Sequence, residues 1–162
     1  MEPELIHNRL QEKFPEEILL VDDSSDIYTV TVKKDCIIDF ILFLKDSLGF
    51  QFLTDLCGIH YPMQELQLGV VYHLHNLPEN IRIRVKTFMS VEKPEINSIT
   101  EIFSAANWME RETYDFFGIT FINHPNLIRI LNVEYLDYFP LRKEYPLEDQ
   151  TRTDKDDRFF GR

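Results

Sequence analysis

The segment ERETYDFFG, residues 110–118, holds the residue types of an acid–base active site. Its carboxylates, Glu110, Glu112 and Asp115, could hydrolyse a glycosidic bond if two of them faced each other across about 5–10 Å. The surrounding apolar spacing predicts a helix, however, in which residues two apart diverge by about 200°. Glu110 and Glu112 therefore cannot converge on one bond. The alternative is a surface helix on which Arg111 and Asp115, four residues apart, form a pair that contributes about 0.2–0.5 kcal/mol.

Metal and nucleophile chemistry have less support. His73 and His75, in the segment YHLH, would share one face of a strand, and His60 could approach them. A third ligand is unassigned, and no HExxH or CxxC motif accompanies the pair. The chain also lacks a GxGxxG or GxxxxGK(S/T) motif for a nucleotide or flavin, and it has no serine-nucleophile signature. We therefore interpret His73 and His75 as solvent-facing strand residues.

Composition narrows the function further. The two cysteines cannot hold an iron–sulfur cluster alone, because such clusters usually take four thiolates. A net charge of −11 opposes binding to a phosphate backbone, so we expect no nucleic-acid partner. No apolar run approaches the roughly 18 residues of a membrane span, and the N-terminus lacks the positive-then-apolar order of a signal peptide. These features predict a soluble, cytosolic protein.

The elements that would position these residues predict an α+β domain. Two helices are expected at residues 4–14 and 36–48, the second capped by Asp35 and closed by Gly49. A capping box of Ser98 and Glu101 opens the third, which runs to Gly118 as one long helix or as two short ones meeting near Asn107. Strand patterns occupy residues 17–21, 27–32, 50–59, 66–74 and 81–88. This order predicts a two-layer fold with a mostly antiparallel sheet and helices on one face.

After residue 131 the periodicity fails, and Pro140 and Pro146 oppose a helix. A structureless stretch of this length is uncommon inside a compact domain. It is nevertheless too rich in leucine, tyrosine and phenylalanine for a solvated linker. We therefore divide the chain into a compact α+β domain, residues 1–131, and an extended, largely irregular tail, residues 132–162, that docks on a partner.

Three segments within about residues 50–147 together resemble one family, the NuoC or 30-kilodalton subunits of NADH–quinone oxidoreductase, which is respiratory complex I. The first, W-x-E-R-E-x-x-D-x-x-G-I-x-F, is matched by Trp108, Glu110, Arg111, Glu112, Asp115, Gly118, Ile119 and Phe121. The second, H-P-x-L-x-R-I-L, is matched by His124, Pro125, Leu127, Arg129, Ile130 and Leu131. The third, P-L-R-K-(D/E)-(F/Y)-P-L, is matched by Pro140, Leu141, Arg142, Lys143, Glu144, Tyr145, Pro146 and Leu147.

Two departures accompany the match. Family members often carry Gly-His before the third segment, where this chain has Tyr138 and Phe139. The usual aspartate of a VDYP segment is His60 here. Both departures leave the local contacts unassigned.

The resemblance implies a non-catalytic structural and assembly subunit in the peripheral arm of proton-pumping NADH–quinone oxidoreductase. Such a subunit has no catalytic, cofactor-binding or metal residue of its own, and FMN and iron–sulfur clusters would belong to partner subunits. The implied partners are the hydrogenase-like large subunit, which helps to form the quinone site, and the subunit with the terminal iron–sulfur cluster. The chain would lie on the cytoplasmic side of the inner (plasma) membrane, attached only through the complex.

If the chain is such a subunit, its first segment has more charged residues than a solvent-exposed helix face would need. We expect some of them to be buried, against the second and third segments or at the partner interface, because buried ion pairs fix a geometry without catalysing anything. Arg142 and Lys143 are the expected charged contacts with the large subunit.

Three alternatives stay open. The chain could be the homologous subunit of a ferredoxin- or F420-dependent dehydrogenase or of a membrane-bound hydrogenase, and a neighbouring gene for an NADH- and flavin-binding partner would favour complex I instead. An independent small enzyme would show turnover by the purified chain, lost on changing Glu112 or His124. A free-standing adaptor would not be a stoichiometric component of one large complex.

Overall fold

The computed structural model describes residues 3–22, 24 and 26–145. The elements in chain order are α1 (Pro3–Lys13), β1 (Ile18–Asp22), β2 (Tyr28–Val32), the short 3-10 helix η1 (Lys34–Cys36), α2 (Ile37–Leu48), β3 (Phe52–His60), β4 (Leu68–Asn76), β5 (Ile81–Met89), β6 (Glu95–Asn97), α3 (Ala106–Phe117) and β7 (Thr120–Ile122). The predicted α+β class is confirmed: the described residues contain three α-helices, and the five expected strands are present at slightly different boundaries.

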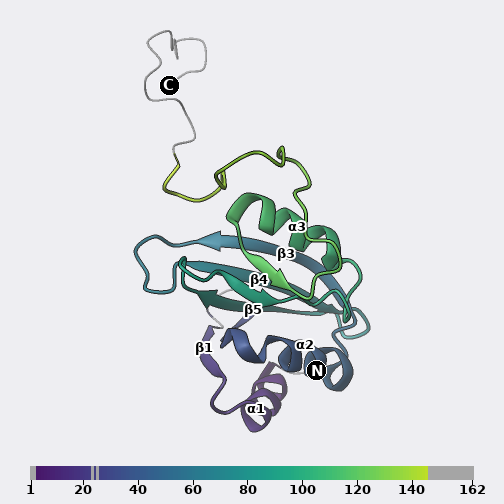
Figure 1. The fold of residues 1–162 in the computed structure, drawn as a ribbon. Helices are drawn as coiled ribbons and strands as arrows, with labels where there is room; N and C mark the ends of the chain where they lie inside the picture. Colours follow the sequence, from purple (N-terminus) through teal and green to yellow (C-terminus); the bar gives the residue numbers. More distant parts are fainter. Residues whose placement is uncertain (1–2, 23, 25, 146–162) are drawn as a thin grey trace, which may run out of the picture.

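The main sheet has the strand order β1-β2-β5-β4-β3 (Figure 1). All its pairs are antiparallel except β2–β5, which is parallel. The parallel pair arises because the chain leaves β2 through α2, enters the far edge at β3, and returns through two hairpins to place β5 beside β2. The mostly antiparallel sheet is therefore confirmed.

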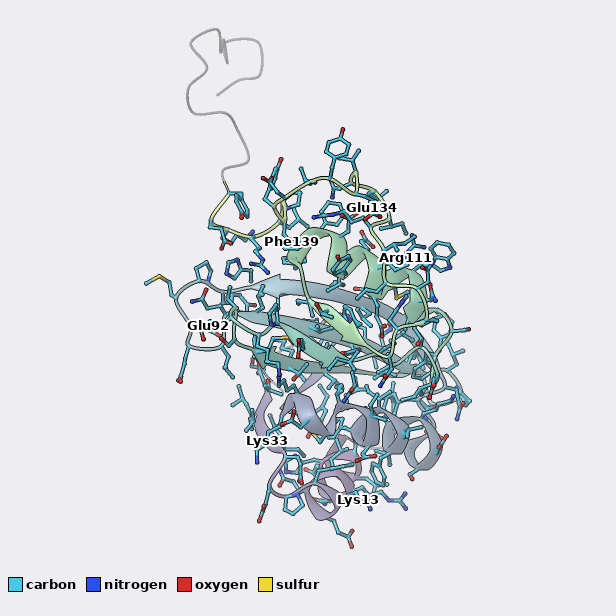
Figure 2. All side chains as sticks on the ribbon, viewed as in Figure 1. Lys13, Lys33, Glu92, Arg111, Glu134 and Phe139 are labelled. Carbon is cyan, nitrogen blue, oxygen red and sulfur yellow. The ribbon has the colours of Figure 1, made fainter. Side chains whose placement is uncertain are left out.

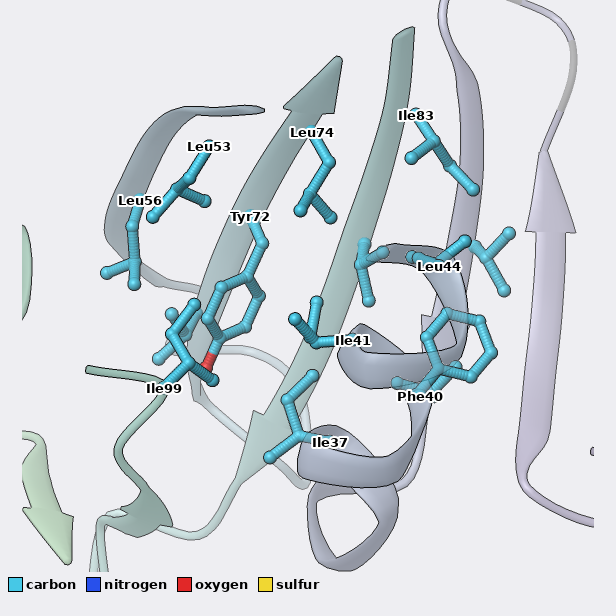
Figure 3. Close-up of a cluster of buried hydrophobic side chains, with 14 of the residues drawn as sticks. Ile37, Phe40, Ile41, Leu44, Leu53, Leu56, Tyr72, Leu74, Ile83 and Ile99 are labelled. Atoms are coloured by element: carbon cyan, nitrogen blue, oxygen red, sulfur yellow. The ribbon is translucent and has the colours of Figure 1, made fainter. Parts of the chain in front are cut away.

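One face of the sheet carries the hydrophobic core. Tyr72 and Leu74 of β4 are two residues apart and so point to the same side, where they meet α2 side chains such as Ile41 and Leu44 (Figure 3). All four are buried, and burial of each such side chain stabilises the fold by about 1.5–3 kcal/mol. Gly49 ends α2 in the left-handed conformation, at φ 76°, as the sequence predicts.

Helix α3 covers β3 on this same side. Gly58 of β3 pairs with Val70, which shares a face with Tyr72. A Cβ atom on Gly58 would lie only 2.4 Å from the ring of Phe117, at the end of α3. Helices α2 and α3 thus pack on one face, as predicted.

Two local predictions are wrong, and one pair of strands was not predicted. Asp35 lies inside η1 and makes no side-chain cap for α2. The predicted capping box of Ser98 and Glu101 does not open α3, which begins at Ala106; the hydroxyl of Ser98 accepts from the N–H of Thr100 (3.1 Å) in a short turn and donates to Glu110 (2.6 Å). The parallel pair β6–β7 was not expected, since strands of three residues leave no readable alternation.

No helix in the described part of the chain is long and apolar enough to cross a membrane.

Candidate functional site

Asp115 is the centre of a hydrogen-bond network at the end of α3. Its carboxylate is buried and accepts the N–H groups of Ile130, Leu131 and Asn132 at 3.1, 2.8 and 2.9 Å. Arg129 Nη1 donates to the other oxygen at 2.8 Å, so this is a buried ion pair. Burial by itself raises the pKa of a carboxyl, but these donors and the Arg129 charge hold the pKa of Asp115 well below its ordinary value.

Arg129 connects this ion pair to the segment that follows it. Its Nη1 also donates to the backbone carbonyl of Asp115 at 2.9 Å. Its Nη2 donates to the carbonyls of Leu136 (2.7 Å) and Tyr138 (3.3 Å). One buried guanidinium therefore joins α3 to a segment without helix or strand.

The C-terminus of α3 obtains its missing hydrogen bonds from the same segment. An α-helix leaves its last four carbonyls without partners inside the helix. Here the N–H of Gly118 donates to the carbonyl of Tyr114 at 2.8 Å, and Arg129 donates to the carbonyl of Asp115. The N–H of Leu141 donates to the carbonyl of Phe116 (3.2 Å), and Nε of Arg142 donates to that of Phe117 (2.7 Å). The two arginines also place positive charge at the negative end of the helix dipole.

Phe139 is held between these two arginines. Its ring centre lies 5.0 Å from Cζ of Arg129 and 4.8 Å from Cζ of Arg142, within cation–π range. A Cβ atom on Gly118, which has a φ of 71°, would come within 2.4 Å of this ring. Glycine is therefore required at position 118 for two reasons, the left-handed turn and the closeness of Phe139.

Arg111 holds the start of the same segment. It donates to the carbonyls of Ile128 (3.1 Å) and Arg129 (3.0 Å), and its guanidinium lies 4.9 Å from the ring of Trp108. The surface-helix alternative, in which Arg111 pairs with Asp115, does not fit, because both residues are buried and have other partners. The segment running along α3 offers carbonyls to Arg111 and N–H groups to Asp115, so each finds its own partners. Figure 2 shows Arg111 on α3 and Phe139 beside the helix.

We call these contacts the α3–tail anchor; its residues are Arg111, Asp115, Gly118, Arg129, Phe139, Leu141 and Arg142.

Glu110 lies outside the anchor and has a different environment. Its carboxylate is also buried, but it accepts only from the hydroxyl of Ser98 (2.6 Å) and the N–H of Ile99 (2.8 Å). Burial raises its pKa to about 7, since these two hydrogen bonds only partly offset the loss of water. The buried hydroxyl of Tyr72, which lies nearby, has no hydrogen-bond partner among the described residues.

The other residues of the first two family segments lie at the surface or hold a turn. Glu112 and Pro125 are exposed. Nδ1 of His124 accepts from the N–H of Asn126 at 3.0 Å, so its Nε2–H donates to the carbonyl of Asn107 at 3.0 Å. This histidine thus fixes a turn.

The third segment contacts β3. The backbone N–H of Lys143 donates to Nδ1 of His60 at 3.0 Å, while the Lys143 side chain is exposed. A histidine can therefore supply an acceptor where the family has an aspartate. Arg142, expected at a partner, is used within the chain, with Glu144 3.7 Å away. Pro140 is half-buried and Leu141 exposed.

The arrangement holds protein segments and offers little chemistry. Glu110 is buried and Glu112 exposed, so the two carboxylates diverge as predicted. Residues 3–22, 24 and 26–145 contain no group of three side chains able to hold a metal. The interpretation of both strand histidines as solvent-facing is wrong for His75, which is buried, while His73 accepts from Arg84 at 2.8 Å.

Large apolar side chains are exposed around the anchor. We call this the α3–tail surface; it consists of Trp108, Ile128, Leu131, Val133, Tyr135, Tyr138, Leu141 and Tyr145. Trp108, Leu131 and Tyr135 are 61%, 69% and 87% exposed. Figure 1 shows the segment that carries most of them passing over α3. The remainder of the predicted tail, residues 146–162, lies outside the described residues.

The sequence identified every anchor residue except Phe139. It also missed two partners outside the anchor, Ser98 for Glu110 and His60 for Lys143. Phe139 and His60 stood out only as departures from the family pattern. Ser98 was assigned to a capping box, so its contact with Glu110 had no readable signal.

A family model and the curated relatives of this chain indicate the same family. A family model described as respiratory-chain NADH dehydrogenase, 30 Kd subunit, matches residues 30–151. The NuoC subunit of NADH-quinone oxidoreductase from Citrifermentans bemidjiense is 42% identical over 144 residues, which are 89% of each chain. The corresponding NADH-quinone oxidoreductase subunit from Geobacter metallireducens is 41% identical over 145 residues, 89% of this chain and 90% of that one.

Two solved structures share the fold. A trypsin-resistant fragment of Nqo5 superimposes with a TM-score of 0.69 and 28% identity, covering 78% of this chain and 100% of the fragment. A chain of the membrane-bound sulfane sulfur reductase, an archaeal respiratory membrane complex, gives a TM-score of 0.75 and 26% identity, covering 89% of this chain and 85% of that chain.

Proposed function

We infer the function from a family assignment: the chain belongs to the 30 kDa subunit family of respiratory-chain NADH dehydrogenase, complex I. We propose that it is a non-catalytic structural and assembly subunit of the peripheral arm. In this role it supports the subunits that form the quinone site while electrons pass from NADH to quinone.

The α3–tail anchor is the observation that carries this proposal. Its buried charges, Arg111, Asp115 and Arg129, have protein partners that satisfy them, so they are not available for substrate. Their effect is to fix an irregular segment in one path over α3. Fixing a segment before binding reduces the entropy lost on association, which favours a docking role.

The α3–tail surface is the docking region in this proposal. Tryptophan and tyrosine are enriched at the residues that dominate binding energy in protein interfaces, and Trp108 and Tyr135 are both well exposed. The proposed partners are the hydrogenase-like large subunit and the subunit with the terminal iron–sulfur cluster. FMN and iron–sulfur clusters belong to partners, and the chain is held at the cytoplasmic side of the membrane through the complex.

Native-gel migration of the protein from gently solubilised membranes, with mass spectrometry of the band, tests this role. We expect comigration with hydrogenase-like and iron–sulfur subunits, and reduced comigration for Trp108→Ala and Tyr135→Ala. Leu77→Ala is the control, because Leu77 is 57% exposed in the turn between β4 and β5. Tyr135→Ala and Leu77→Ala should leave the unfolding free energy of the isolated chain within about 0.5 kcal/mol. Trp108→Ala also removes the cation–π contact with Arg111, so it should cost about 0.5–1 kcal/mol.

Migration of the chain alone, at about its own mass, from membranes that contain an intact complex would contradict the proposal. Lys143→Glu tests the charged contact separately, since the Lys143 side chain is exposed whereas Arg142 is used within the chain. Undiminished copurification of the large subunit with this variant would exclude Lys143 from the interface.

The likeness to an archaeal respiratory membrane complex supports a second candidate. In that case the chain is the homologous subunit of a ferredoxin- or F420-dependent dehydrogenase or of a membrane-bound hydrogenase. NADH oxidation by the purified assembly decides between them: the first proposal requires it, and the second requires its absence.

A further inference from the structure

The face of the main sheet opposite α2 and α3 has a distinct chemical character. Alternate residues of β5, Arg82, Arg84 and Lys86, point to this side, because Ile83 and Val85 between them are buried in the core. They pair across to His75, His73 and Val71 of β4. We call this side the open face.

The open face is basic along its middle and acidic at its edges. Arg82, Arg84 and Lys86 form a row on the central strand β5. Asp22 of edge strand β1 and Asp55 of edge strand β3 lie on either side of this row. The middle of this face therefore carries three cations, although the whole chain has a net charge of −11. At the β3 edge Glu112 of α3 lines a pocket with Asp55, so the negative charge lies at the margin.

The row is held in place by its neighbours. Nε of Arg84 donates to Nε2 of His73 at 2.8 Å, and Nδ1 of His73 faces Asp55 at 3.7 Å. Burial and the Arg84 charge lower the pKa of His73, so the imidazole is neutral and serves as an acceptor. Arg84 is thereby oriented, while Arg82 is exposed. Exposed Leu20 (61%) and Phe52 (50%) add apolar area on the edge strands of the same face.

We propose that the open face binds an acidic segment of a neighbouring subunit in the same complex. Residues two apart on a strand are about 6.8 Å apart, so the three cations match carboxylates at every second residue of an extended segment. This surface is separate from the α3–tail surface. This second proposal depends on the proposed function in one respect, that the chain is part of a complex.

The geometry favours a protein over other polyanions. Clusters that bind anionic lipid usually contain about 4–8 lysines and arginines, more than this row provides. A phosphate backbone would also meet Asp22 and Asp55, whereas a narrow acidic segment lies between them. The chain's own residues 146–162 contain five acids and four bases and so match the row poorly.

Charge reversal in the assembled complex tests the inference. With Arg82→Glu/Lys86→Glu we expect about a tenfold loss in retention of one neighbouring subunit, since reversal turns attraction into repulsion. The effect should shrink as salt rises, because salt screens exposed charges. Lys13→Glu is the matched control, because Lys13 is exposed at the end of helix α1, outside the main sheet (Figure 2). Equal retention for the double variant and the wild type would overturn the inference.

A second measurement leaves the charges unchanged. A photo-crosslinking amino acid replaces Leu20, and the assembled complex is irradiated. We expect attachment to a partner peptide rich in aspartate and glutamate. Attachment to lipid, to nucleic acid or to residues 146–162, or no attachment, would overturn the inference. If Trp108→Ala weakens assembly while these results are negative, the proposed function survives without this second surface.

Discussion

Two buried carboxylates on α3 show how differently one helix can treat the same chemical group. Asp115 and Glu110 are five residues apart and both are fully buried. Asp115 has a guanidinium and several N–H donors, which lower its pKa. Burial raises the pKa of Glu110 to about 7, because among the described residues it has two donors and no cation. Burial alone therefore does not decide the charge state; the partners do.

The two sites also differ in what they hold. Asp115 binds three consecutive backbone N–H groups and Arg129, and so fixes the start of the tail. Glu110 binds the turn at Ser98 and Ile99, which lies before α3. The first site joins α3 to the irregular segment that follows residue 129, and the second joins α3 to the turn before it.

The largest effect is expected from Asp115→Asn, which keeps the shape but removes the charge. Arg129 would be left buried without its counterion, at a cost of about 3–5 kcal/mol in the free energy of unfolding. Denaturant unfolding measures this loss, with Glu112→Gln, an exposed site, as the control. A cost similar to that of the control would mean that the buried pair contributes nothing.

Acid gives the same site a second test. Because the folded pKa of Asp115 lies below its unfolded value, its contribution is present above about pH 4 and is lost as the pH falls. The stability of Asp115→Asn should thus decline less between pH 5 and pH 2 than that of the wild type.

Glu110→Gln should change the pH dependence of stability at neutral pH, where the wild type becomes less stable as the pH rises. Because the folded pKa of about 7 exceeds the ordinary 4.5, the contribution of Glu110 is complete below about pH 4.5 and is lost as the pH rises through 7. The wild type should lose on the order of 3 kcal/mol from this group by pH 8, whereas glutamine should not. Unfolding free energies at pH 5 and pH 8 measure the difference; equal slopes in both proteins would contradict the assigned environment.

Gly118→Ala should loosen only the tail side of α3. The left-handed backbone and the clash with Phe139 together cost about 1–3 kcal/mol, and trypsin should cut faster at Arg142 and Lys143. Gly49→Ala is the matched control, since Gly49 has a φ of 76° at the end of α2. It should lower stability while tail cleavage within the folded protein stays slow. Equal protection in both variants would show that Phe139 does not hold the segment.

The smallest effect is expected from Tyr72→Phe beside Glu110. The hydroxyl has no hydrogen-bond partner among the described residues, so its removal should be neutral or stabilising by up to about 1 kcal/mol. Thermal unfolding measures it. A loss above about 2 kcal/mol would indicate a hydrogen bond from this hydroxyl that the structure does not contain.

Local pattern was enough to predict much of the fold. The strands around Tyr72 and Ile83 and the helix that Gly49 ends could be read from alternation, periodicity and glycine. The start of α3 could not be predicted from the sequence. The pattern at Ser98 is typical of a helix cap, whereas the hydroxyl of Ser98 donates to Glu110, 12 residues further along the chain. Capping preferences are local, whereas this hydrogen bond is set by the approach of two elements.

By itself, the sequence determined that Glu110 and Glu112 diverge, that helices end at Gly49 and Gly118, and that the chain has the family's three segments. Helical geometry and the conformational freedom of glycine act within a few residues, so sequence displays them. Only the tertiary structure decided that Asp115 pairs with Arg129 and not with Arg111, and that Asp115 and Glu110 shift in opposite directions. Those outcomes depend on burial and on donors from distant segments, and both are settled when the segments pack together.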